Sequence, residues 1–310
     1  MTRKLITSIF LSIVVCFTLI ARTPVKNLDG DVKLMIGNDL GRNGYYEQKK
    51  IAELMGEMAD EVGPDAFLAL GDTHHFLGVA SVDDPLWMTN YELIYSHPEL
   101  HINWYPILGN HEYRGNSQAV IDYSKISRRW NMPARYYSKI FEEDGTRIKI
   151  IFIDTTPIID KYHEKNDKYP DVCQQDVEAQ LKWLDEELGK NEDVDWTVVV
   201  GHHPIYADTY KDSEERKDMV KKVDPILRKY NVDMYICGHI HNFQHIKQNG
   251  IDYIVNSSAS LSRKKVSAVE GTVFYNGDSG FSILTATKKN LSLSMINHKG
   301  NIIHQVTRTK

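Results

Sequence analysis

Side chains that can bind metal follow five separate apolar runs of this chain, and a glycine stands shortly before each group. They are Asp39, Asp72, His74, His75, Asn110, His111, His202, His203, His239 and His241. Burying several ionisable groups side by side costs free energy unless an opposite charge compensates. Carboxylates, an amide oxygen and neutral imidazoles are ligands for a divalent or trivalent cation. The pattern therefore predicts a metal site.

The apolar runs have the length of buried strands. They occupy residues 32–37, 66–71, 103–109, 148–154, 196–201 and 233–238. Segments with helical periodicity alternate with them, at residues 45–63, 116–130, 175–190 and 215–230. Strands that alternate with helices pair in parallel, and continuous apolar runs indicate strands covered on both faces. Ligands of such sheets bind beyond the carboxyl ends of the strands, so the polar groups are expected to meet there.

The pattern changes after Gly250, where strand-like segments follow one another with Asn and Gly turns and no helix between them. This part of the chain predicts antiparallel sheet. No repeat or long linker interrupts the chain, which favours one catalytic domain over residues 22–310.

Each motif has a simpler explanation when it is taken alone. A Gly-Asp pair after a strand is usually a turn, and the stretch 109–112 is also typical of a helix start. A single His-x-His pair occurs in loops and cores without metal. Five such motifs at five strand ends favour one shared metal site.

The composition is that of a globular protein, with 42% hydrophobic and 25% charged residues and a net charge of −5. The charge argues against a surface for polyanions, so we expect no nucleic-acid partner. We also expect a monomer.

The first 21 residues predict a secretory signal peptide. A short basic start is followed by an uncharged run from Leu5 to Ala21. We therefore expect an exported protein, either secreted, periplasmic or in the secretory pathway, with no membrane attachment after removal of the signal. An uncleaved anchor and a lipid attached at Cys16 are the alternatives, because the run approaches the length of a spanning helix.

The order of the motifs resembles the calcineurin-like metallophosphoesterases, and in particular the small purple acid phosphatases of the tartrate-resistant type. The residues that carry the resemblance are Asp39, Gly71-Asp72, Gly109-Asn110-His111-Glu112, Gly201-His202 and Gly238-His239-Ile240-His241. The similarity extends from about Val32 to the end of the chain. It implies an α/β fold, a four-layer α/β/β/α sandwich with two mixed sheets flanked by helices.

The resemblance also implies a binuclear centre. In the family's scheme Asp72 bridges two ions, Asp39, His75 and His241 hold the first, and Asn110, His202 and His239 hold the second. Iron is the implied metal at one site, with iron, zinc or manganese at the other. The implied activity is an acid phosphatase that hydrolyses phosphate monoesters of small molecules or phosphoproteins by direct attack of a metal-bound hydroxide. His111 would face the phosphate and protonate the leaving group.

Two positions depart from the family pattern. The tyrosine that gives the family its purple colour is replaced by His75, whose imidazole lacks phenolate-to-iron charge transfer. We expect a working centre that is not purple, with His74 as the alternative ligand. The family's second active-site histidine is absent from residues 204–217, where Lys211 or the neighbouring His203 could substitute.

Two other functions stay open because of these departures. One is a phosphodiesterase or nucleotide pyrophosphatase with the same core. The other is a protein that retains metal without turnover.

Overall fold

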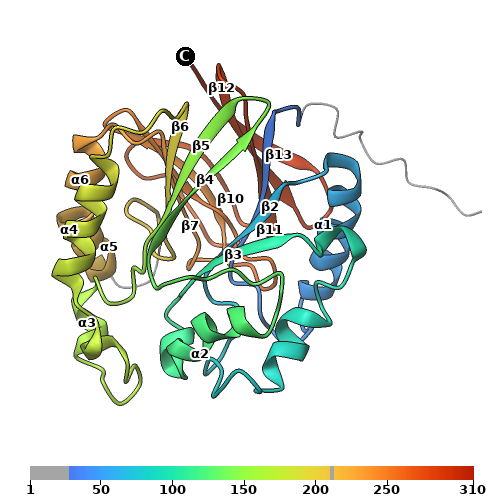
Figure 1. Ribbon diagram of the computed structural model, residues 1–310, viewed down its shortest axis with the longest axis vertical. Helices are drawn as coiled ribbons and strands as arrows, with labels where there is room; N and C mark the ends of the chain where they lie inside the picture. The colour runs from blue at the N-terminus through green and yellow to red at the C-terminus, as the bar shows by residue number, and fades with distance from the viewer. Residues whose placement is uncertain (1–27, 210–212) are drawn as a thin grey trace, which may run out of the picture.

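The computed structural model describes residues 28–209 and 213–310. Two β-sheets pack against each other and helices cover their outer faces, which gives the layer order α/β/β/α (Figure 1). This confirms the predicted fold class. The predicted signal peptide, residues 1–21, lies outside the described residues. In the part of the chain that is described, none of the helices has the length and apolar character needed to cross a membrane.

The first sheet has six strands in the order β13-β12-β11-β1-β2-β3. Their bounds are β1 (Val32–Gly37), β2 (Ala66–Leu70), β3 (Asn103–Ile107), β11 (Gly280–Ala286), β12 (Asn290–Asn297) and β13 (Ile302–Thr309). Strands β1, β2 and β3 are parallel, whereas β11, β12 and β13 pair antiparallel. The parallel strands therefore end at one edge of this sheet.

The second sheet has seven strands in the order β10-β8-β9-β7-β6-β5-β4. Their bounds are β4 (Tyr137–Glu143), β5 (Thr146–Phe152), β6 (Trp196–Val200), β7 (Met234–Cys237), β8 (Phe243–Gln248), β9 (Ile251–Val255) and β10 (Thr272–Asn276). Strands β5, β6, β7 and β9 are parallel. Periodicity did not predict β4, β8 or β10, because each is a partly polar strand beside a hairpin turn or at a sheet edge.

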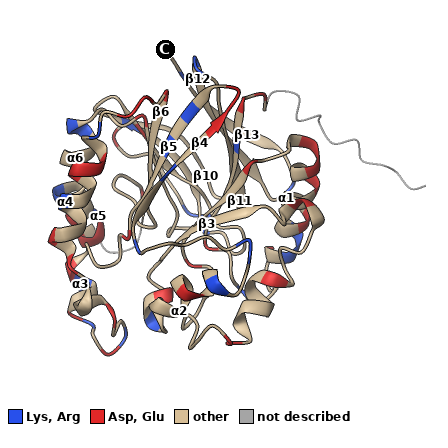
Figure 2. Ribbon diagram, viewed as in Figure 1, with Lys and Arg blue, Asp and Glu red and all other residues tan. Residues whose placement is uncertain are grey.

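Helix α1 (Gln48–Val62) covers the first sheet, and α4 (Val177–Leu188), α5 (Ser213–Lys222) and α6 (Asp224–Lys229) cover the second (Figure 1). The short helices are α2 (Ser117–Asp122) and α3 (Asp160–His163). Single helical turns lie at Met88–Glu92, Pro98–Leu100, Glu112–Arg114, Tyr123–Lys125 and Val172–Gln174. Lys and Arg are mixed with Asp and Glu along the flanking helices (Figure 2). The expectation of no nucleic-acid partner stays a prediction.

Local sequence explains where the main helices begin and end. Helix α1 ends at Gly63, which has a φ of 63° and donates its N–H to the Ala59 carbonyl. Helix α4 begins after Asp176, whose side chain accepts a hydrogen bond from the Ala179 N–H. The predicted helix 215–230 is two helices, because Pro225 lacks the N–H that a continuous helix would need.

The predicted helix at residues 116–130 is wrong beyond its first turns. Helix α2 ends at Asp122 and one further turn ends at Lys125. The apolar spacing that mimicked a helix comes from Tyr123 and Trp130, which pack against Trp87 with ring centroids at 3.5 and 5.4 Å. Tertiary packing, not helical periodicity, places these rings in the core.

The prediction of antiparallel sheet after Gly250 fails at one pairing. Strand β9 pairs in parallel with β7, with Ile254 opposite Ile236. A hairpin turn at Asn249 and Gly250, with φ values of 51° and 81°, folds β8 against the other side of β9. The pairing of β9 with β8 and all pairings of β10 to β13 follow the predicted antiparallel pattern.

Candidate metal centre

The loops after five parallel strands carry the predicted ligands to one region. Asp39 follows β1, Asp72 follows β2 and Asn110 follows β3, whereas His202 follows β6 and His239 follows β7. The two groups of strands belong to different sheets, so the region lies where the carboxyl ends of both sheets meet.

Four predicted ligands adopt a backbone conformation that is rare outside glycine. The φ angles of Asp39, Asp72, His239 and His241 are 50°, 52°, 72° and 59°. Each such residue costs on the order of 1 kcal/mol, and such strain collects at functional sites. The chain therefore turns sharply at these strand ends, where the buried side chains gather.

Two carboxylates form the middle of the cluster. Oδ2 of Asp72 lies 3.2 Å from Nε2 of His202 and 3.4 Å from Nε2 of His75. Oδ1 of Asp39 lies 2.9 Å from Nε2 of His241 and 3.8 Å from Nε2 of His75. These side chains form overlapping groups whose donor atoms lie within 4.8 Å of one another. The geometry is that of a small, closed set of oxygen and nitrogen donors.

Several donor atoms are buried without a well-aligned hydrogen bond to any described residue. Among the predicted ligands they are Oδ1 of Asp39, Nε2 of His75, Oδ1 of Asn110, Nε2 of His202 and Nδ1 of His241. Leaving a buried polar atom unsatisfied costs about 1–3 kcal/mol. The opposite ring nitrogens are held, since Nδ1 of His75 lies 2.9 Å from the Gly41 carbonyl and Nδ1 of His202 lies 2.9 Å from the Leu70 carbonyl. Backbone carbonyls thus orient both rings toward the cluster, and the donor set fits metal ions.

The protonation states of Asp39, Asp72 and His75 suit metal binding, whereas His202, whose pKa burial lowers but Asp72 raises to about 9, would have to release a proton when it binds an ion. Burial raises the pKa of Asp39 and Asp72, but His241 and His202 outweigh it, so both carboxyl pKa values fall well below their usual range. Burial also lowers the pKa of His75, although Asp72 opposes this effect. Ionised carboxylates and a neutral imidazole are the forms that bind a cation.

His74 is not part of this cluster. Its ring meets Trp87 edge-on with centroids 4.3 Å apart, and its Nδ1 lies 3.5 Å from the Asn90 amide nitrogen. Burial lowers its pKa to about 3, so it packs as a neutral ring. Of the two adjacent histidines, His75 is the one that faces the carboxylates.

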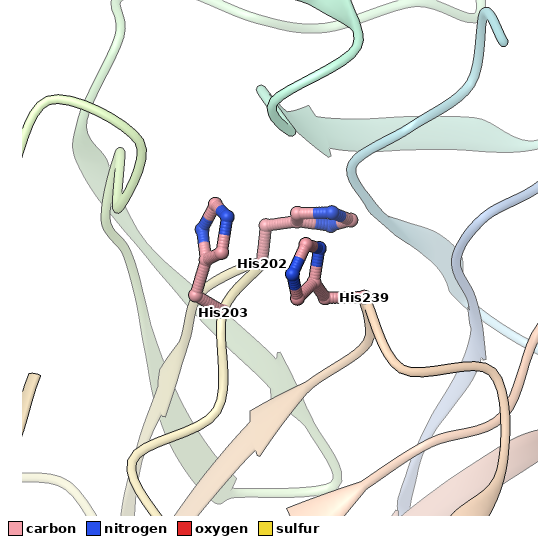
Figure 3. Close-up of side chains that lie close together, drawn as sticks. All are labelled: His202, His203 and His239. Carbon is pink, nitrogen blue, oxygen red and sulfur yellow. The ribbon is translucent and has the colours of Figure 1, made fainter. Parts of the chain in front are cut away.

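His203 lies beside His202 and His239, as Figure 3 shows. Both of its ring nitrogens are already engaged, Nδ1 by the Thr155 hydroxyl at 2.8 Å and Nε2 by the Tyr162 hydroxyl at 2.9 Å. Its donor atoms lie within reach of those of His202 and His239, but both nitrogens are taken up by hydroxyl groups of the protein, so we do not assign it as a ligand. Lys211, the other suggested substitute for the family's second histidine, lies outside the described residues.

Glu112 is a structural residue of the site that motif reasoning did not assign. Its Oε2 accepts the backbone N–H of Asp72 at 2.9 Å and that of Gly109 at 2.8 Å, and its Oε1 accepts the N–H of His74 at 3.0 Å. Burial and the charge of Asp72 raise its pKa to about 7. One carboxylate thus ties the loop after β2 to the loop after β3. Its place in the stretch 109–112 was the available signal.

Two further side chains have no signal in the sequence. Arg42 is buried beside the centre, with its guanidinium carbon 5.2 Å from the centroid of the Phe76 ring. Burial lowers its pKa, whereas Asp39 and Asp72 oppose that shift. Glu215 is a buried carboxylate whose Oε2 lies 3.0 Å from Nε2 of His239.

Gly109 is required by the close approach of two loops. A Cβ at this position would lie 2.3 Å from Oδ1 and 2.6 Å from the backbone nitrogen of Asp72. We expect Gly109→Ala to displace Asp72 and weaken metal binding by about 10- to 100-fold. Metal titration followed by calorimetry measures the change. Gly63→Ala, where the added Cβ meets nothing within 4 Å, is the control: it is strained by its φ of 63° but lies at the end of α1. Equal losses of affinity in both variants would contradict the prediction.

The geometry agrees with a family match. The family model described as calcineurin-like phosphoesterase matches residues 32–243. This chain belongs to that family. Purple acid phosphatase 4 of Arabidopsis thaliana is 29% identical over 98% of this chain and 94% of the plant protein. Tartrate-resistant acid phosphatase type 5 of Oryctolagus cuniculus is 28% identical over 84% of this chain and 83% of the rabbit protein.

Solved structures share the fold of this phosphoesterase. GAP50, described as the anchor in the inner membrane complex of Plasmodium, superposes with a TM-score of 0.78 at 22% identity over 91% of this chain and 89% of its own. The purple acid phosphatase PPD1 from yellow lupin superposes with a TM-score of 0.64 at 14% identity over 90% of this chain and 53% of its own. At these identities the likeness concerns the fold alone, so the chemistry depends on the donor set.

Proposed function

We propose that this protein is a metal-dependent phosphatase that hydrolyses phosphate monoesters at a binuclear centre. The observation that supports this most is the convergence of Asp39, Asp72, Asn110 and the three histidines His75, His202 and His241 on one buried region. His239 lies beside His202 with ring centroids 5.1 Å apart. The family match and the acid phosphatase relatives agree with this activity.

The roles of the residues follow from their positions. Asp72 belongs to two of the donor groups, so it would bridge the two ions. Asp39, His75 and His241 would hold one ion, and Asn110, His202 and His239 the other. Bound ions would supply Lewis-acid activation of water and neutralise the phosphate.

His111 is placed to act on substrate. Its side chain is 15% exposed, and its Nε2 lies 3.8 Å from Oδ2 of Asp72. The Phe76 carbonyl lies 2.9 Å from Nδ1 and fixes the ring with Nε2 toward the cluster. Because Nδ1 donates to this carbonyl, Nε2 could pass a proton to the leaving oxygen only from the imidazolium form, which the negative charge of a bound phosphate would have to stabilise against burial.

Hydrolysis assays test the proposal. The purified protein is loaded with Mn, Zn or Fe and assayed with an aryl phosphate and an aryl phosphodiester. We expect hydrolysis of the monoester and at least tenfold slower hydrolysis of the diester. A factor of about ten is what the loss of a single contact between enzyme and substrate produces. Faster hydrolysis of the diester would favour a phosphodiesterase. Metal binding without turnover of either compound would favour the non-catalytic binding protein.

The metal at the site of His75 gives a spectroscopic prediction. Imidazole in place of phenolate leaves zinc and manganese open beside iron. We expect the iron-loaded protein to lack a phenolate-to-iron band, and His75→Tyr to gain one in the visible spectrum. His101→Tyr, at an exposed position, is the control for a tyrosine outside the site. A strong visible band in the iron-loaded wild type would contradict the assignment.

We further propose that the chain is exported and that residues 22–310 form one catalytic domain. The relatives' coverage of nearly the whole chain supports the second statement. Fractionation of cells that express the full chain, with N-terminal sequencing of the product, tests both export and the cleavage site.

A further inference from the structure

A buried carboxylate stands behind one of the proposed metal ligands. Oε2 of Glu215, in the first turn of α5, lies 3.0 Å from Nε2 of His239. The Glu215 side chain is 3% exposed and that of His239 is 4% exposed. A carboxylate in this position accepts the Nε2 proton, which leaves Nδ1 as the nitrogen with the lone pair.

The other oxygen of Glu215 is held by two donors from α3. The Tyr162 hydroxyl donates to Oε1 at 2.8 Å, and Nζ of Lys161 forms an ion pair with the same atom. The carboxylate is therefore fixed from the side opposite His239.

His203 completes the arrangement. Because the Tyr162 hydroxyl donates to Glu215, its oxygen must accept the Nε2 proton of His203. The Thr155 oxygen accepts the His203 backbone N–H at 3.1 Å, and its hydroxyl proton is then available to Nδ1. One consistent set of donors and acceptors thus runs from Thr155 through His203 and Tyr162 to Glu215. The ring centroids of His203 and His239 lie 4.3 Å apart, and Figure 3 shows the two rings side by side.

We propose that Glu215 is the positioning residue of the second metal ion: it fixes the tautomer and orientation of His239 so that Nδ1 binds the ion. This inference rests on the binuclear centre proposed above. A carboxylate that accepts the outer proton of a ligating imidazole makes the ligand more basic, and loss of such a partner lowers metal affinity about 10- to 100-fold. Among the described residues, the contacts of Glu215 are with Lys161, Tyr162 and His239 and not with Asp39, His75 or His241, so we expect the effect to be confined to the second ion.

A purely structural salt bridge predicts a different result. If Glu215 served only to join α5 to Lys161 of α3, its replacement would lower the melting temperature. The affinities for the two ions would then change by the same factor or not at all. The ratio of the two metal affinities separates these explanations, because it does not change when the whole fold becomes less stable.

The test compares Glu215→Gln with Glu178→Gln, an exposed acid in the first turn of α4. Each purified chain is stripped with a chelator and titrated with zinc in a calorimeter, and metal per chain is counted after dialysis. We expect wild type and Glu178→Gln to retain two ions, and Glu215→Gln to retain one and bind the second about 10- to 100-fold more weakly. Unchanged binding of both ions by folded Glu215→Gln would overturn the proposal.

A second variant covers the case in which Glu215→Gln does not fold. Tyr162→Phe removes one donor to Glu215 but keeps the carboxylate and Lys161, so we expect a smaller weakening of the same ion. Equal weakening of both ions in this variant would also overturn the proposal. The readout is independent of turnover: a wild type that binds two ions but hydrolyses no phosphate ester would contradict the proposed function and leave the role of Glu215 intact.

Discussion

Asp72→Asn is expected to abolish both metal binding and phosphatase activity. Asp72 approaches three imidazoles, those of His75, His111 and His202, and its carboxylate is ionised in the folded protein. An amide supplies one neutral oxygen where a bridging carboxylate would supply two charged ones. Since loss of an outer partner alone lowers metal affinity about 10- to 100-fold, loss of this ligand should exceed about 100-fold.

Thermal unfolding with and without metal measures this loss separately from catalysis. A ligand that binds only the folded state at 100 times its dissociation constant stabilises that state by about 2.7 kcal/mol. We expect this stabilisation in the wild type and in Asp83→Asn, an exposed acid later in the same loop. We expect none in Asp72→Asn. Retained metal stabilisation in Asp72→Asn would mean that the cluster binds ions without it.

His111→Ala has the second largest expected effect, and it should separate turnover from metal content. The alanine keeps the backbone N–H that donates to Oδ1 of Asp72 at 2.9 Å, so the bridging carboxylate stays in place. It removes the imidazole that, in the proposed function, would face the phosphate. We expect kcat to fall about 10²- to 10⁴-fold with little change in bound metal.

Steady-state kinetics and elemental analysis of the same preparation measure both quantities. His101→Ala, at an exposed position outside the cluster, is the matched control. Parallel loss of metal and kcat in His111→Ala would make this histidine structural. Burial lowers the pKa of the His111 imidazole to about 2 in the metal-free protein. Asp72 opposes this effect, whereas His75 and Arg114 add to it.

The sequence predicted the fold and the gathering of donors because both depend on local patterns. Continuous apolar runs that end in glycine and then Asp, Asn or His are visible without coordinates, and parallel strands bring such ends together. The same patterns failed at residues 116–130, where aromatic spacing reflects contacts with Trp87. They failed again at β9, because the sequence of a single segment does not determine which strands become its neighbours in the sheet.

The resemblance favoured His75 over His74, but the contacts of the two rings were needed to exclude the alternative. His74 and His75 differ in sequence by one place, but one packs on Trp87 and the other faces Asp72. His203 is distinguished from His202 by the partners of its two nitrogens. Glu215 is one of several charged residues of α5, so its type does not distinguish it. Its partner His239 lies 24 positions further along the chain, in a different element. Periodicity carries no information about such pairs.

The hydrogen bonds of Glu112 separate two properties of the loops that follow β2 and β3. Backbone N–H groups, which every amino acid except proline possesses, tie these loops together through one carboxylate. The side chain at position 75 can therefore vary from phenol to imidazole while the path of the main chain is kept. A single replacement at position 75 is therefore expected to alter which ion is preferred while the hydrogen bonds of Glu112 keep both loops in place.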